Sequence, residues 1–90
     1  MANKKELNWF IYILKCNDQT LYTGVTTDLQ RRVEEHNSGK LGARYTAARR
    51  PVHLIYHEQA DSRSVAQKRE HQIKCLSRKE KQQLISSYKK

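Results

Sequence analysis

The pattern of apolar and polar positions along the chain predicts three β-strands. Residues 9–16 are rich in aromatic and β-branched residues and are apolar on both faces up to Leu14, which is typical of a central strand. Turn-forming residues 17–20 lead into a second strand at residues 21–26, so that the two strands form a hairpin. A third strand is expected at residues 52–58, after Pro51, because a strand tolerates proline at its start. Its alternation places Val52, Leu54 and Tyr56 on one face.

Three helices are predicted from capping boxes, in which a hydroxyl residue is followed three positions later by Gln or Glu, at residues 27–30, 64–67 and 77–80. The first helix is expected to run to about residue 37 and to end at Gly39. Residues 38–50 are expected to form a basic loop. The apolar residues that face the core from the last two helices are expected to be Val65, Ala66, Ile73, Leu76, Leu84, Ile85 and Tyr88.

The resulting element order, ββαβαα, is typical of an α+β fold in which helices cover a three-stranded antiparallel sheet. Residues 9–88 are expected to form this single domain, after a flexible polar leader at residues 1–8. A chain of 90 residues supports only a modest core, since a domain of this size buries roughly 60–65% of the surface that it exposes when unfolded.

The charge distribution favours a polyanionic partner. The sequence has 18 Lys and Arg against 9 Asp and Glu, a formal net charge of +9, and no acidic residue lies between Glu35 and Glu58. Such a surface suits phosphate contacts, and the alternative is a solvated basic surface without a specific partner. The side chains expected to contact nucleic acid are Lys40, Arg44, Tyr45, Arg49 and Arg50.

The apolar runs bear on cellular location. The longest, at residues 9–14, is far shorter than the ~20 residues that a membrane helix needs, and the first residues lack the apolar stretch of a signal peptide. A cytoplasmic protein with no membrane partner is therefore expected. Cys16 and Cys75 lie far apart, and neither has the spacing of a zinc site. We expect both thiols to be reduced and buried.

A few residues are candidates for a functional role, although each also has a structural explanation. Tyr12 interrupts an aliphatic strand. Gly24 stands inside a strand, which indicates either close approach of another group or a β-bulge. Arg32 and His36 lie four residues apart and therefore share one helix face. Glu70 falls at the edge of an apolar stripe, where a carboxylate is either idle or turned inward to hold a metal ion or an arginine.

Taken in order, these residues resemble the motifs of the GIY-YIG nuclease superfamily, and the chain closely resembles its small single-domain bacterial members. The likeness covers residues 9–85. The segment FIY at residues 10–12 is similar to the first motif, with Phe in place of Gly. The segment YTG at residues 22–24 is similar to the second, with Thr in place of Ile. The family arginine, histidine and metal-binding glutamate fall on Arg32, His36 and Glu70.

This resemblance implies an endonuclease that hydrolyses phosphodiester bonds of DNA, including branched or damaged DNA, with one Mg²⁺ or Mn²⁺. Glu70 would hold the ion, which clamps the scissile phosphate and stabilises the leaving oxygen. Arg32 would neutralise developing charge. Tyr22 would take the proton of the attacking water, helped by a nearby cation because its ordinary pKa is about 10. Tyr12 and His36 would position the water or relay the proton, and Tyr12 is the alternative base.

Two other hypotheses stay open. The same scaffold would also suit a nucleic-acid-binding module with little or no cleavage, or a basic accessory protein that docks on ribosomal RNA or an acidic partner. The enzyme is favoured because a scaffold kept only for binding has no need of the Glu70 carboxylate. Tyr45 is a further candidate site residue in the basic loop. A homodimer or a separate targeting protein is left open as a partner.

The register of the hairpin provides a test of a shared site. Side chains alternate across a strand, so Tyr12 and Tyr22 meet only if both lie on the same face of the sheet. Pairing Cys16 with Thr20 through a three-residue loop sets Tyr12 opposite Gly24 and places both tyrosines on one face. A four-residue loop would separate them. We therefore predict the three-residue loop.

Overall fold

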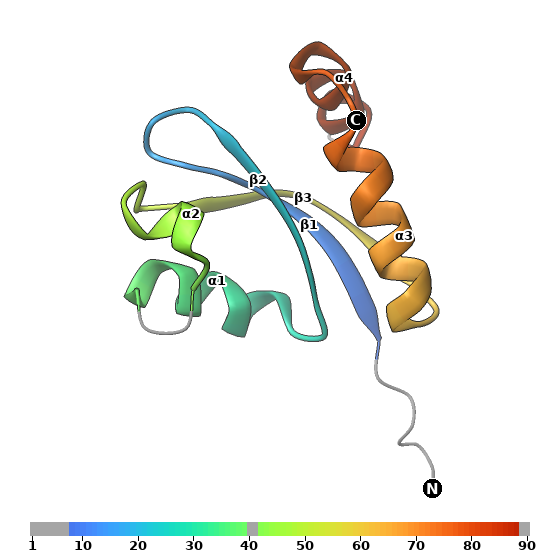
Figure 1. Cartoon of the computed structure of the whole chain (residues 1–90), viewed down its shortest axis with the longest axis horizontal. Coiled ribbons are helices and arrows are strands. Elements are labelled where there is room, and N and C mark those ends of the chain that lie inside the picture. The colour runs from blue at the N-terminus through green and yellow to red at the C-terminus, as the bar shows by residue number, and fades with distance from the viewer. Residues whose placement is uncertain (1–7, 40–41, 89–90) are drawn as a thin grey trace, which may run out of the picture.

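The computed structural model describes residues 8–39 and 42–88, and among them it contains three strands and four helices (Figure 1). The strands are β1 (Trp9–Lys15), β2 (Leu21–Thr26) and β3 (His53–Ala60), and the helices are α1 (Leu29–Ser38), α2 (Arg44–Ala47), α3 (Arg63–Lys74) and α4 (Arg78–Tyr88). The predicted order ββαβαα is confirmed, with the short α2 added where a loop was expected. Residues 1–7 of the expected leader lie outside the described residues, as does Lys40.

The sheet is antiparallel with the order β2-β1-β3, so β1 is the central strand, as its continuous apolar sequence predicts. The predicted register is confirmed: Tyr12 pairs with Gly24, and the Cys16 amide donates to the Thr20 carbonyl at 2.9 Å. The three-residue loop closes with Gln19 in the left-handed region, at φ 74°, which is a common geometry for such loops. Tyr12 and Tyr22 therefore lie on one face of the sheet.

The predicted alternation of β3 is wrong beyond its first residues. A β-bulge between Ile13 and Leu14 leaves Ile55 as an extra residue, because Ile13 pairs with Tyr56 while Leu14 pairs with Leu54. Leu54 consequently packs on the face that carries Tyr12, whereas Tyr56 turns to the opposite face. The sequence of β3 does not reveal this inserted residue, because apolar and His residues occupy both sets of alternating positions in the strand.

The helices form a layer on each side of the sheet (Figure 1). Leu29 and Val33 of α1 pack against the face that carries Tyr12, whereas α3 and α4 cover the opposite face. Two helices begin elsewhere than their predicted capping boxes: the side chain of Asp28 caps α1, and that of Ser62 caps α3. In both places an earlier or later polar residue satisfies the same orphan amides. The predicted terminator Gly39 is the C-cap of α1.

The box at the start of α4 is confirmed by two reciprocal hydrogen bonds. The Glu80 amide donates to Ser77 Oγ at 3.1 Å, and the Ser77 amide donates to Glu80 Oε1 at 2.8 Å. Together they satisfy two amides at the helix start, as such boxes do. In this way only three residues separate the end of α3 from the start of α4.

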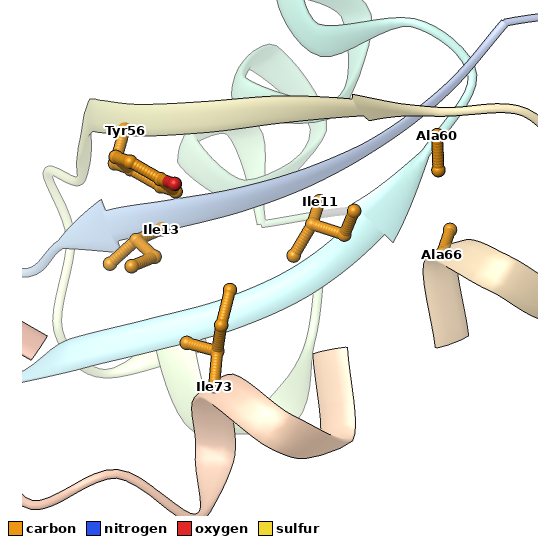
Figure 2. Packing of buried hydrophobic residues seen from close by; sticks show 6 residues of the cluster. All are labelled: Ile11, Ile13, Tyr56, Ala60, Ala66 and Ile73. Atoms are coloured by element: carbon orange, nitrogen blue, oxygen red, sulfur yellow. The ribbon is translucent and has the colours of Figure 1, made fainter. Parts of the chain in front are cut away.

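One cluster of buried apolar residues lies between the sheet and α3, and a second lies on the face that α1 covers. Figure 2 shows Ile11, Ile13 and Tyr56 pointing from the strands toward Ala66 and Ile73 of α3. Two expectations are wrong here: Val65 is 50% exposed, and the Cys75 thiol is exposed rather than buried, although Cys16 is buried. None of the described helices has the length and apolar character required to cross a membrane.

Candidate active site

Tyr12 is the centre of the candidate site. It is 1% exposed, and its ring crosses over β2 at Gly24. A Cβ atom at residue 24 would lie 2.5 Å from Tyr12 Oη and 2.7 Å from Tyr12 Cζ. The β1–β2 register runs without a shift, so the glycine marks close approach of another group and not a bulge. The group that approaches is the tyrosine of the neighbouring strand.

Helix α1 brings Arg32 and His36 to the Tyr12 hydroxyl. His36 Nε2 lies 3.0 Å from Tyr12 Oη, and Arg32 Nε donates to the same oxygen at 3.4 Å. A second nitrogen of Arg32 donates to Glu35 Oε1 at 2.8 Å. The spacing of four residues places both side chains on one helix face, as predicted, and one phenol oxygen joins them.

Burial controls the protonation of this group. Burial raises the pKa of Tyr12 to about 12, against the lowering effect of its hydrogen bond to Arg32. Burial, together with the charge of Arg32, lowers the pKa of His36 to about 4. Near neutral pH the phenol is therefore protonated and the imidazole is neutral. Tyr12 is accordingly a poor base, and His36 is an acceptor or donor of hydrogen bonds without a charge.

Tyr22 and Tyr45 form an aromatic row beside this group. The Tyr22 ring lies 5.2 Å from the His36 ring and 5.9 Å from the Tyr45 ring, with which it is stacked at 23°. The guanidinium of Arg49 covers Tyr45 at 4.0 Å from the ring centroid. Offset stacking and cation–π contact both favour such an arrangement. Tyr45, 37% exposed, thus connects the basic segment to the site.

The basic side chains predicted to contact nucleic acid differ in how they are held. Arg49 donates to Asp18 Oδ2 at 2.9 Å and to the Tyr45 carbonyl at 2.8 Å. Arg50 donates to the Ala47 and Asn37 carbonyls, at the ends of α2 and α1. Both guanidinium groups therefore brace the segment, whereas Arg44 is exposed. Lys40 lies outside the described residues.

Glu70 lies on α3, the helix that covers the face of the sheet opposite Tyr12. Its side chain is 21% exposed, and Oε2 lies 3.1 Å from Lys74 Nζ. Burial is the main cause of the raised pKa of Tyr12, and the charge of Glu70 makes the smallest of the contributions to it. β2 is an edge strand, and a helix on the opposite face can present a side chain around that edge.

An open cleft of about 260 Å³ follows the edge of β2. Its lining comes from β2, α2, α3 and α4, and consists of Leu21, Tyr22, Thr23, Tyr45, Lys74 and Lys81. The cleft thus combines two tyrosine rings with two ammonium groups. Such a lining suits a phosphate-bearing chain, whose anionic groups pair with Lys and whose flat groups contact aromatic rings.

Comparisons with known proteins identify the family. A family model described as the GIY-YIG catalytic domain matches residues 8–83. The chain belongs to the GIY-YIG family. It is 58% identical over 76 residues to a UPF0213 protein of Syntrophus aciditrophicus, which covers 84% of this chain and 87% of that protein. It is 53% identical over 76 residues to a UPF0213 protein of Staphylococcus aureus, covering 84% of this chain and 92% of that protein.

Two solved structures show the same GIY-YIG fold. The solution NMR structure of a UPF0213 protein from Bacillus halodurans has 46% sequence identity and a TM-score of 0.57, and covers 88% of this chain and 83% of that chain. The solution NMR structure of a protein from E. faecalis has 42% identity and a TM-score of 0.61, and covers 100% of this chain and 94% of that chain. The predicted family and fold class are both confirmed.

The donor set of this GIY-YIG domain fits one hard cation held together with substrate. Among residues 8–39 and 42–88, no three His, Cys, Asp or Glu side chains form a cluster that could hold a metal alone. Glu70, which is paired with Lys74 here, would supply one carboxylate, and Mg²⁺ characteristically takes one or two carboxylates, several waters and substrate phosphate oxygens. The residues therefore suit a Mg²⁺ or Mn²⁺ ion whose other ligands are water and phosphate.

The sequence predictions missed several partners of the GIY-YIG residues. Thr46 is fully buried against His36, Glu35 pairs with Arg32, and Lys74 pairs with Glu70. The two ion pairs had a signal, since their spacings of three and four residues on a helix are those of facing side chains. Thr46 had none, because a four-residue helix within a basic segment shows no apolar period.

Proposed function

We propose that this protein is a divalent-metal-dependent endonuclease that hydrolyses phosphodiester bonds of DNA. The observation that carries the proposal is that Arg32 and His36 both contact the Tyr12 hydroxyl. Beside this group lies a cleft that is lined by Tyr22 and Lys74. Family membership supports a nuclease. A module that only bound nucleic acid would gain nothing from burying a neutral His–Tyr pair beside an arginine, since burial of polar groups costs free energy.

Each side chain has a part that its environment supports. Tyr22 lines the cleft and would take the proton of the attacking water as general base. Tyr12 is enclosed, with a pKa raised to about 12 by burial, so its part is to hold Arg32 and His36 in place. Arg32 would stabilise the charge that develops on the phosphoryl oxygens. Glu70 would hold the metal ion, which when bound supplies charge neutralisation at the scissile phosphate.

The location and the substrate path belong to the same proposal. Lys74, Lys81 and the exposed Arg44 would contact phosphates on either side of the scissile bond. Two free cysteines are consistent with a cytoplasmic protein, since reducing compartments keep thiols unpaired.

The test is cleavage of single-stranded, duplex and branched DNA, and of RNA, with Mg²⁺ or Mn²⁺. We expect Arg32→Ala and Glu70→Gln to lower kcat about 10²–10³-fold, while DNA binding in a gel-shift assay persists. Arg31→Ala and Glu34→Gln make the same charge changes at exposed positions of α1 and serve as matched controls that keep activity. Binding by the wild type without cleavage of any substrate would overturn the enzyme and leave a nucleic-acid-binding module.

A further inference from the structure

A buried threonine completes the network around Tyr12 from outside the family motifs. Thr46 Oγ1 lies 2.7 Å from His36 Nδ1 and 3.0 Å from the carbonyl oxygen of Ala43. Thr46 and His36 are both 0% exposed. The close approach is built into the backbone, because a Cβ atom at Gly42 would lie 2.8 Å from His36 Cα. The segment before α2 therefore passes directly over α1 and delivers a hydroxyl to the second ring nitrogen.

Two proton arrangements are compatible with these distances. In the first, His36 carries its proton on Nδ1 and donates to Thr46 Oγ1, and Thr46 donates to the Ala43 carbonyl. His36 Nε2 then accepts from the Tyr12 hydroxyl, and Tyr12 Oη accepts from Arg32 Nε. The four donors of this chain each have an acceptor, at 2.7, 3.0, 3.0 and 3.4 Å. Only the contact of the part-buried Ala43 amide with Nδ1, the longest of the group at 3.5 Å, is given up. All four bonds point the same way, from Arg32 to Ala43.

In the second arrangement, His36 carries its proton on Nε2. Nδ1 would accept from Thr46 and, at 3.5 Å, from the Ala43 amide. Tyr12 Oη would then face two donors, the Nε2 proton and Arg32 Nε. Its own proton would have no acceptor among the described residues, in a side chain that is 1% exposed. A buried hydroxyl donor without an acceptor carries the full penalty of its desolvation, whereas the first arrangement gives up only the long Ala43 contact, so the first arrangement is favoured.

We propose that Thr46 is a positioning residue that holds His36 in the Nδ1–H tautomer and thereby fixes the direction of the hydrogen-bond chain through Tyr12 to Arg32. The orientation of Arg32 depends on this direction. With Nε2 unprotonated, the Tyr12 oxygen keeps a lone pair for Arg32 Nε, while another nitrogen of Arg32 holds Glu35. With Nε2 protonated, two donors compete for that oxygen and the hydrogen bond from Arg32 Nε is weakened.

The tautomer can be measured without any substrate. Two-bond ¹H–¹⁵N correlation spectra of the full chain at neutral pH distinguish a protonated ring nitrogen from an unprotonated one. We expect His36 in the wild type to show a protonated Nδ1 and an unprotonated Nε2. A protonated Nε2, or fast exchange between both forms, would overturn the proposal. This readout does not depend on the proposed nuclease activity, so its failure and the failure of that function are distinguishable.

Two substitutions at residue 46 separate the hydroxyl from the fold. Thr46→Val keeps the shape and removes the acceptor, and should convert His36 to the Nε2–H form or to a mixture. Thr46→Ser keeps the hydroxyl and should retain the wild-type tautomer. Thr26→Val removes another buried hydroxyl, one that bonds near the start of α1, and controls for a general loss of stability. A wild-type tautomer in Thr46→Val would show that Thr46 does not hold it.

The effect on cleavage rests on the proposed function. We expect Thr46→Val to lower kcat about 10–100-fold with KM within about threefold, because misplacing a charge-stabilising group by an ångström carries a cost of this size. Thr46→Ser should stay within about threefold of the wild type in both parameters. A Thr46→Val enzyme with unchanged kcat and a raised KM would contradict the positioning role in catalysis, since the loss would then lie in uniform binding of substrate.

Discussion

The two faces of the sheet are built from alternate residues of the same strand and differ in what they bury. On one face, Ile11 and Ile13 meet α3 in a cluster of apolar side chains. The other face also has an apolar cluster, but there Tyr12 meets buried polar side chains: His36 and Thr46 are fully buried and hydrogen-bonded. The first face gains free energy simply by removing apolar surface from water. The second must satisfy each polar group that it buries.

Because of this difference, one face of the sheet mainly stabilises the fold and the other mainly positions the candidate site residues. The apolar face supplies stability through shape and area, so its residues are exchangeable for others of similar volume. The polar face requires particular hydrogen-bonding atoms at particular distances, and its residues keep the candidate site residues in position. The two faces meet at β2, an edge strand, where the cleft takes Tyr22 from the strand and Lys74 from α3. A substitution on each face should therefore fail in a different way.

The largest expected effect is on the apolar face. Ile73 is 0% exposed, and Ile73→Ala should lower the free energy of unfolding by about 2–5 kcal/mol, because it leaves a cavity. Val65→Ala on the same helix removes a half-exposed side chain and should change stability by less than about 1 kcal/mol. Urea denaturation measures both. Equal losses in the two variants would show that the apolar layer is not the stabilising one.

Gly24→Ala tests how tightly Tyr12 packs against β2 on the polar face. The new Cβ atom would meet the Tyr12 ring, and overpacking of this kind typically costs about 1–3 kcal/mol. The loss should be smaller in a Tyr12→Phe background, because the hydroxyl that lies nearest to the new methyl is gone. A double-mutant cycle by urea denaturation measures this coupling. Strictly additive losses would mean that Gly24 is required for a reason other than the Tyr12 ring.

The pH dependence of stability gives a direct signal from the polar face. Burial lowers the pKa of His36 to about 4, whereas an unfolded histidine has a pKa of about 6.5. The unfolded state therefore binds more protons between these values, and stability falls as the pH drops through this window. From about pH 7.5 to pH 5 the contribution lost is up to about 2 kcal/mol.

The control for this pH effect is a second histidine. His36→Gln should remove the extra pH dependence, while His53→Gln, at an exposed position of β3, should keep it. Urea titrations at the two pH values provide the measurement. If His36→Gln retains the full wild-type slope, the buried imidazole is not its source.

The sequence predicts the apolar face and the motif residues better than it predicts the contacts of α2 that complete the polar face. Apolar runs and turn residues locate the strands, and a capping box locates the start of α4. The parity of Tyr12 and Tyr22 predicts the hairpin register, because a slip of one residue would bury the wrong side chains. The sequence pattern does not predict the β3 bulge or α2, since neither feature changes the periodicity of apolar residues. Thr46 belongs to α2, so its contact with His36 requires tertiary information that no local pattern contains.

The smallest expected effect concerns Arg49, for which sequence and structure favour different roles. The basic charge pattern predicts a phosphate contact, whereas the structure places its guanidinium on Tyr45 and Asp18. As a brace, it should contribute about 0.5–1 kcal/mol to stability, the usual size of a partly exposed cation–π contact or ion pair. Arg49→Ala should then leave the salt dependence of DNA binding unchanged.

Exposed Arg44 provides the comparison that decides between the two roles. If Arg44 contacts a phosphate, Arg44→Ala should reduce the slope of log K against log salt by about one. Arg49→Ala should reduce stability without reducing that slope, because a guanidinium that is held by a carboxylate and a carbonyl releases no counterion when DNA binds. Equal reductions of the slope in the two variants would return Arg49 to phosphate binding and would extend the nucleic-acid surface from the cleft to the β1–β2 loop.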